Sequence, residues 1–175
     1  MLGSFPPQQK RWCIDFYYPN FTNDMWRVVG LIFFHDALHF VDTSAKTYRK
    51  DAIVDFLTTA GIGIYDTATA VRRLQDNASD KYLEIVTPTD IHSLLEQMPL
   101  CTAIVTTGQK ATDTICQYFG VEQPKIGSFA EIESHNRHLR LYRMPSTSRA
   151  YPLALAKKAE VYQQMFEAEG IHSIL

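Results

Sequence analysis

Hydrophobic residues recur along the chain at two different spacings, and this difference divides the chain into helices and strands. Apolar positions three and four residues apart predict amphipathic helices over 24–34, 50–60, 110–119 and 153–168, with a shorter helix over 90–97. Asn23 stands at the N-cap position of the first helix. Gly61 and Gly120 follow two of the others, as glycines often do at helix C-termini.

Short apolar runs between these helices predict strands over 62–65, 102–106 and 139–143. The first two runs are typical of buried strands, whereas the third alternates and predicts a more exposed strand. The chain opens on Met1-Leu2-Gly3, as if within a further, short strand. Strands that alternate with helices predict a parallel sheet with helices on both faces, hence an α/β fold in one domain over residues 1–175.

Polar segments follow several of these strands. In α/β sheets, ligands bind beyond the carboxyl ends of the parallel strands. Four segments are therefore expected to meet at one edge of the sheet: the loop after Gly3, Asp66-Thr67, Thr107-Gly108-Gln109, and Pro145-Ser146-Thr147-Ser148.

Composition restricts the function classes only weakly. A length of 175 residues suits one domain, and the net charge of -2 does not indicate a nucleic-acid partner. Between residues 134 and 158, however, every ionised side chain is basic, which either forms a phosphate-binding face or balances acids elsewhere. Three cysteines without metal-ligand spacing favour reduced thiols in a cytoplasmic protein, and no apolar run approaches the roughly 20 residues that span a bilayer.

Aromatic residues gather in a loop near the start of the chain, here named the aromatic loop (residues 16–24). Phe16-Tyr17-Tyr18 either offers a stacking face for a planar base, worth roughly 1–3 kcal/mol per base, or covers the edge of the sheet. Asn23 either caps the next helix or holds a water or a base carbonyl through its amide, which both donates and accepts.

Carboxylates and hydroxyls at the strand ends are the other candidates for chemistry. Asp66 directly follows a strand, where it orients a water or caps Thr67, and Asp15 is a more weakly placed acid in the first loop. Thr107 opens a helix and so offers an anion or base-edge site, although the same sequence is also a common turn.

A second loop, here named the serine loop (residues 145–149), carries Pro145, Ser146, Thr147, Ser148 and Arg149. Its hydroxyls and backbone N–H groups suit the binding of DNA phosphates without a metal, and Arg149 adds a positive charge. The alternative is an ordinary turn.

Several catalytic motifs are absent from the sequence. It contains no Walker loop, no dinucleotide-binding Gly-x-Gly-x-x-Gly and no Gly-x-Ser-x-Gly elbow. His35 and His39 are four residues apart, so on a helix they would share a face and could ligate a metal, but no third ligand is evident and we expect no metal site.

The segments Gly3-Ser4-Phe5-Pro6-Pro7, Phe16 through Trp26, and Met144 through Ser148 together resemble the uracil-DNA glycosylase superfamily. The most similar branch is the hypoxanthine-DNA (deoxyinosine) glycosylases, which read Gly-Thr-Phe-Pro-Ser, Phe-Tyr-Tyr-x-x-Pro-x-Asn-Arg-Phe-Trp and Pro-Ser-Thr-Ser-Pro-Ala. Residues 61–66 also resemble the Gly-Ile-Ala-Leu-Trp-Asp of that branch, so the resemblance spans nearly the whole chain.

The resemblance implies a three-layer α/β/α sandwich around a four-stranded parallel sheet. It also implies a monofunctional DNA glycosylase that removes a flipped deaminated base, hypoxanthine or uracil, from double-stranded DNA carrying a damaged or mismatched base. We expect it to act as a monomer without a cofactor. Tyr18 resembles the aromatic that stacks on the base, Asn23 the amide at the base and water, and the serine loop the segment that pinches phosphates. Gly3, Phe5 and Thr107 are expected to line the base site.

Two positions depart from the superfamily pattern. Phe5 stands where many members carry Asn or Asp to position the water, and Met144 where many carry His or Asn. The uracil mechanism therefore does not carry over, and Asn23 becomes the main candidate for the missing chemistry. The alternatives are a catalytically altered DNA-binding protein on the same fold and an unrelated α/β hydrolase.

Overall fold

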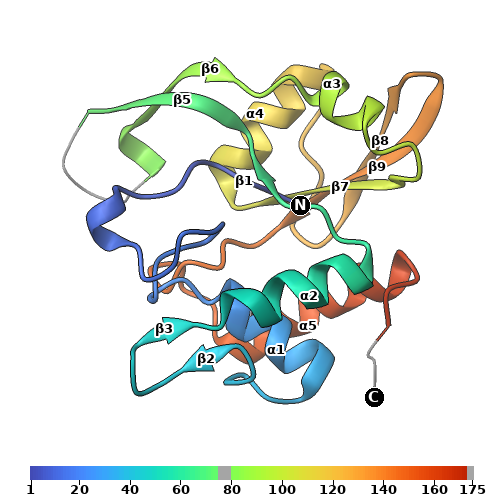
Figure 1. The fold of residues 1–175 in the computed structure, drawn as a ribbon. Coiled ribbons are helices and arrows are strands. Elements are labelled where there is room, and N and C mark those ends of the chain that lie inside the picture. Colours follow the sequence, from blue (N-terminus) through green and yellow to red (C-terminus); the bar gives the residue numbers. More distant parts are fainter. Residues whose placement is uncertain (75–79, 173–175) are drawn as a thin grey trace. The chain divides into compact units, whose positions relative to one another are not determined.

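The computed structural model describes residues 1–74 and 80–172, and the chain divides into two compact units (Figure 1). Unit 1 contains Met1–Phe5 and Tyr65–Met144, and unit 2 contains Pro6–Ile64 and Pro145–Leu175. Each unit therefore combines segments that are distant in the sequence.

Unit 1 is built on a five-stranded sheet in the order β4-β1-β7-β9-β8. Strands β4, β1, β7 and β9 are mutually parallel, and β8 runs antiparallel to β9 at the edge. The strands are β1 (Leu2–Gly3), β4 (Tyr65–Asp66), β7 (Ala103–Thr107), β8 (Phe129–Ser134) and β9 (Arg137–Met144). The expected α/β class is confirmed, and the sheet gains an antiparallel fifth strand that the sequence did not indicate.

A second, two-stranded sheet in unit 1 pairs β5 (Ala68–Arg73) with β6 (Leu83–Pro88), preceded by the short helix η2 (Asp80–Tyr82). Neither of these strands was predicted. The predicted strand over 62–65 is also misplaced: only Tyr65 and Asp66 pair with β1.

The core of unit 1 lies between one face of the main sheet and two helices, α3 (Ile91–Glu96) and α4 (Gln109–Phe119). Both helices were predicted to within one residue at each end. Leu139 and Leu141 of β9 are 2% and 0% exposed and belong to this core, so the prediction of a more exposed strand over 139–143 is wrong. The reason is that β9 lies between β7 and β8.

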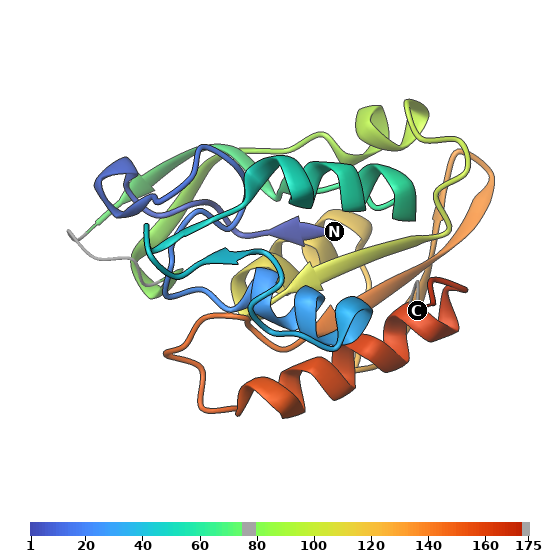
Figure 2. The same cartoon turned by 60° about the horizontal axis from the view of Figure 1, so that its bottom comes forward.

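Unit 2 is built on three helices, α1 (Met25–Phe34), α2 (Lys50–Ala60) and α5 (Leu155–Ala168). Phe33 of α1 contacts Phe56 of α2 and Phe166 of α5, with ring centroids 4.7 and 5.1 Å apart. Figures 1 and 2 show α1 and α5 side by side. The unit also holds η1 (Gln9–Arg11) and a small hairpin of β2 (Val41–Asp42) and β3 (Thr47–Tyr48).

Helix α2 has the predicted bounds, and its C-cap Gly61 adopts the left-handed conformation, φ 67°, that favours glycine. Among the described residues, no helix is long and apolar enough to cross a membrane.

The register of the parallel strands aligns four strand ends. Gly3 pairs with Asp66, Thr107 with Met144, and Leu2 with Thr106, so Gly3 and Thr107 lie at the same level. Three of the four segments expected at the carboxyl edge therefore begin side by side in unit 1. The fourth, the serine loop, begins at the residue after Met144 and belongs to unit 2.

Candidate functional site

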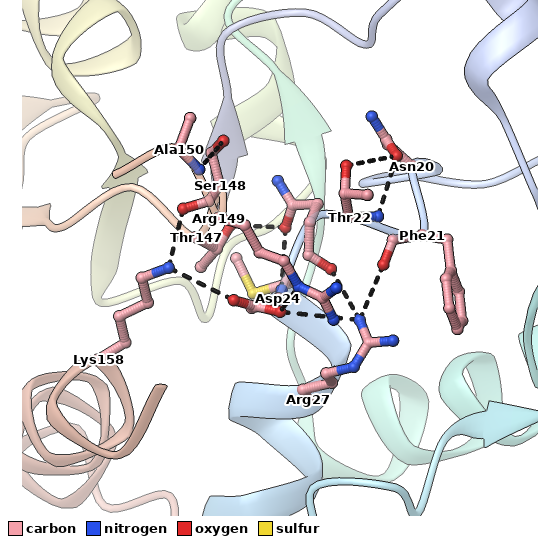
Figure 3. Close-up of polar contacts among 12 residues, drawn as sticks. Asn20, Phe21, Thr22, Asp24, Arg27, Thr147, Ser148, Arg149, Ala150 and Lys158 are labelled. Atoms are coloured by element: carbon pink, nitrogen blue, oxygen red, sulfur yellow. Dashed lines mark hydrogen bonds and ion pairs between the residues drawn. The ribbon is translucent and has the colours of Figure 1, made fainter. Parts of the chain in front are cut away.

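The aromatic and serine loops lie side by side in unit 2 (Figure 3). Asn23 and Ser148 form an isolated antiparallel bridge. The Asp24 N–H donates to the Thr147 carbonyl at 2.8 Å, and the Arg149 N–H donates to the Thr22 carbonyl at 3.3 Å. Two motifs that the sequence singled out at opposite ends of the chain are thus joined through their backbones.

The side-chain amide of Asn23 is fixed in one orientation. Its oxygen accepts hydrogen bonds from the Thr147 hydroxyl at 2.8 Å and from the Met25 N–H at 2.9 Å. A backbone N–H only donates, so the amide atom that faces Met25 must be the oxygen. The amide nitrogen donates to no other described residue, and Asn23 is half-buried, so its two N–H groups remain available to a ligand. The N-cap of α1 is Asp24, not Asn23 as predicted, and the Asn23 amide instead closes a turn onto the first residue of the helix. The amide nitrogen remains as a donor.

The backbone of Asn23 is held as firmly. Its N–H donates to the Asn20 carbonyl at 2.8 Å, and its carbonyl accepts from the Tyr48 hydroxyl at 2.5 Å. Burial raises the pKa of Tyr48 to about 12, so the phenol stays protonated and continues to donate. Arg27, buried beneath the loop, donates to the Tyr48 hydroxyl and to the Phe21 carbonyl.

Asp24 is the centre of a charge cluster that the sequence did not reveal. Its carboxylate oxygens lie 2.9 Å from Arg149 Nε, 3.5 Å from Lys158 Nζ and 3.7 Å from Arg27 Nη1 (Figure 3). The Lys158 side chain is 1% exposed and that of Asp24 is 10% exposed. One carboxylate thus faces three cations.

Helical spacing contained a signal for this buried lysine. Lys158, Tyr162, Met165 and Phe166 recur at the positions of one face of α5, and all are buried. Since the other three are apolar or aromatic, a lysine on that face needs a specific partner.

Tyr18 adopts the left-handed backbone conformation, with φ 50°. This conformation is uncommon for a bulky residue and persists only where neighbouring groups hold it. Its ring stands edge-on to Trp26 with centroids 6.1 Å apart, and the Trp26 indole N–H donates to the Tyr17 carbonyl at 3.2 Å. The aromatic loop is therefore held in a strained shape around a fully buried tryptophan.

In unit 1, two carboxylates lie near the aligned strand ends. The Ser4 hydroxyl donates to the Asp80 carboxylate at 2.7 Å. The Thr89 hydroxyl donates to the backbone carbonyl of Asp66, also at 2.7 Å. Burial, with a smaller contribution from the charge on Asp80, raises the pKa of Asp66 to about 6. Burial also raises the pKa of Asp80, and the Ser4 hydrogen bond opposes that rise. Asp66 therefore changes its protonation state near pH 6, well above the range of an exposed carboxyl.

This elevated pKa has a consequence for stability. From the unfolded value of 3.8 to about 6, Asp66 binds more protons in the folded protein, so the free energy of unfolding falls as pH rises through that window. Asp66→Asn is expected to stabilise the protein at pH 8 by roughly 2–3 kcal/mol and to have little effect at pH 4. Urea denaturation at both pH values measures this, with the exposed Asp55→Asn as control; an equal effect at the two pH values would contradict the assignment.

The remaining predicted residues are placed less favourably. Asp15 is exposed and makes no hydrogen bond or ion pair with the described residues. Thr107 is buried, and its hydroxyl donates to the Leu2 carbonyl at 3.4 Å. Gly3 is buried within the sheet, and Phe5 is half-buried. Met144 is 1% exposed, so this position supplies core volume.

The basic stretch is largely occupied by internal contacts. Arg137 donates to the Leu95 and Pro99 carbonyls, each at 2.8 Å, and Arg143 donates to the Gln109 amide oxygen at 2.6 Å. Together with the Asp24 cluster, these contacts indicate that most basic side chains between residues 134 and 158 bind groups of the protein itself rather than form a phosphate-binding face.

No three His, Cys, Asp or Glu side chains gather into a possible metal site in the part of the chain that the structure describes. In comparisons with known proteins, the chain matched no protein-family model, no curated protein and no solved structure.

Proposed function

We propose that the protein is a monofunctional DNA glycosylase that hydrolyses the N-glycosidic bond of a flipped, deaminated base. The resemblance of its motifs to the hypoxanthine-DNA glycosylase branch motivates the proposal, and one observation carries it. Thr147 of the serine loop fixes the amide of Asn23 in the aromatic loop, 124 residues away, with its N–H groups presented as donors.

A fixed donor suits a deaminated base. Hypoxanthine and uracil carry a carbonyl oxygen where adenine and cytosine carry an amine, so an oriented N–H group attracts the first pair and repels the second. The same donor stabilises the negative charge that develops on the base as the glycosidic bond breaks. Asn23 thereby contributes both to selectivity and to the departure of the base.

The other roles follow from the resemblance and remain part of the proposal. Tyr18 stacks on the extruded base, and the serine loop binds phosphates on double-stranded DNA that carries a damaged or mismatched base. A water held by Asn23, Asp66 or Asp15 completes hydrolysis. The proposal includes the three-layer α/β/α sandwich and a monomer that needs no cofactor.

A release assay under single-turnover conditions tests the proposal. Short duplexes carry hypoxanthine, uracil, xanthine or a thymine mismatch, and alkaline cleavage reveals abasic sites. We expect release of hypoxanthine or uracil and none from an undamaged duplex. Release from none of these duplexes would overturn the proposal.

A second candidate is a DNA-binding protein that has lost catalysis. It is favoured by Met144, which is fully buried at a position where many superfamily members carry a polar side chain. This candidate predicts tight binding to abasic or mismatched duplex without base release, so a binding titration on the same duplexes separates the two.

A further inference from the structure

Two side chains of α5 donate hydrogen bonds to backbone carbonyls of the serine loop. The Lys158 ammonium donates to the Ser148 carbonyl at 2.8 Å, and one helical turn later the Tyr162 hydroxyl donates to the Pro145 carbonyl at 2.8 Å. These carbonyls lie on either side of Thr147 in the chain. The segment that carries the Thr147 hydroxyl is therefore fixed at both ends.

Lys158 is unusual because its charge is fully enclosed. The side chain is 1% exposed, and a lysine ammonium is very rarely buried without a partner. Its ammonium contacts the Ser148 carbonyl and, at 3.5 Å, the Asp24 carboxylate, so it links the serine loop to the aromatic loop (Figure 3).

The position of Lys158 excludes a direct role at the DNA backbone. Phosphates approach from solvent, and an ammonium with 1% exposure cannot meet one without leaving both of its partners. Lys158 is the last residue of the basic stretch 134–158, but its ammonium binds groups in the interior of unit 2 rather than a ligand in solvent.

We propose that Lys158 is a positioning residue: it holds the serine loop so that Thr147 keeps the Asn23 amide oriented with its N–H groups toward the ligand. The expected effect of Lys158 on the rate of base release rests on the proposed function. Its structural consequence, the orientation of the Asn23 amide, is measured separately.

The kinetic test compares single-turnover base release with DNA affinity. Lys158→Met keeps an unbranched side chain one atom shorter than lysine and removes its charge. We expect the release rate to fall about 10- to 100-fold, as small displacements of catalytic groups cause. DNA affinity and its salt dependence should stay unchanged, as they should in the exposed Lys125→Met control. A salt slope lowered by about 1 would instead indicate a lost phosphate contact and would overturn the proposal.

A double-mutant cycle with Thr147→Val tests whether the two residues act through one another. If Lys158 works through Thr147, the double variant releases base no more slowly than the slower single variant. Multiplying rate losses would show that they act independently. The side chain in Lys158→Gln is neutral but can still donate a hydrogen bond to the Ser148 carbonyl, so this variant should retain more activity than Lys158→Met. It replaces Lys158→Met in the cycle if the methionine variant does not fold.

The structural readout is the pair of Asn23 side-chain N–H resonances in a nitrogen–proton spectrum. We expect this pair to shift and to exchange faster with solvent in Lys158→Met and Thr147→Val, but not in Lys125→Met. An unchanged pair in Lys158→Met would overturn the positioning role even if the enzyme is active. If the wild-type protein releases no base yet the pair shifts, the proposed function fails and the positioning role stands.

Discussion

Replacing Asn23 with alanine is expected to lower the single-turnover rate of base release by about 10²–10³-fold, the usual cost of removing one preorganised donor from a developing charge. The donor is preorganised because Thr147 and Met25 occupy the amide oxygen. Alanine removes the N–H groups, and it also removes the two hydrogen bonds that the amide oxygen accepts, each worth about 1 kcal/mol of stability. The rate is therefore measured well below the unfolding transition of the variant.

Asn20 provides a matched control in the same loop. Within the described part of the chain, its amide oxygen accepts only from Thr22, at 3.0 Å from the N–H and 2.9 Å from the hydroxyl. Asn20→Ala should therefore alter release by no more than a few-fold. Asn23→Asp is the sharper test, because it preserves the shape and exchanges the donor for an acceptor. Release by either Asn23 variant at the wild-type rate removes Asn23 from the mechanism.

The second large effect is on folding. Asp24→Asn is expected to lower the free energy of unfolding by about 3–5 kcal/mol, the usual cost of breaking a buried ion pair by removing one partner. The variant replaces the carboxylate with a neutral amide, so the buried Lys158 ammonium loses its counter-charge and keeps only neutral partners, and Arg27 loses the same carboxylate. Since domains of this kind are stable by only about 5–15 kcal/mol, urea denaturation should show a large shift of the midpoint.

Two comparisons isolate the cause of that loss. Arg149 also contacts Asp24, but its side chain is 48% exposed, so Arg149→Met should cost about 1 kcal/mol or less. Asp24→Asn combined with Lys158→Met removes the stranded charge and should be more stable than Asp24→Asn alone. A loss below about 1 kcal/mol in Asp24→Asn would mean that the cluster contributes little to folding.

Local signals predicted the helices well. The bounds of α2 and the left-handed cap at Gly61 follow from an amphipathic period that ends at a residue without a side chain. The same reasoning placed α4 to within one residue. These elements satisfy their own backbone hydrogen bonds, so their sequences alone contain most of the information that places them.

Strands were predicted less well because their hydrogen bonds go to distant partners. β8 was missed, and β9 was expected to be exposed, because only the pairing between them and with β7 decides that β9 is internal. The apolar run at 62–65 contributes only Tyr65 to β4, because the register with β1 determines which residues pair.

For the candidate site, the sequence by itself identified the aromatic loop, the serine loop and Asn23. Their residue types restrict the chemistry: an amide that can donate, rings that can stack and hydroxyls that can bind phosphate. Only the tertiary structure decided that Thr147 takes the amide oxygen and that Asp24 and Lys158 form a buried pair across the two loops. Contacts between residues more than a hundred positions apart leave no period or spacing in the sequence, because they depend on where the folded chain returns.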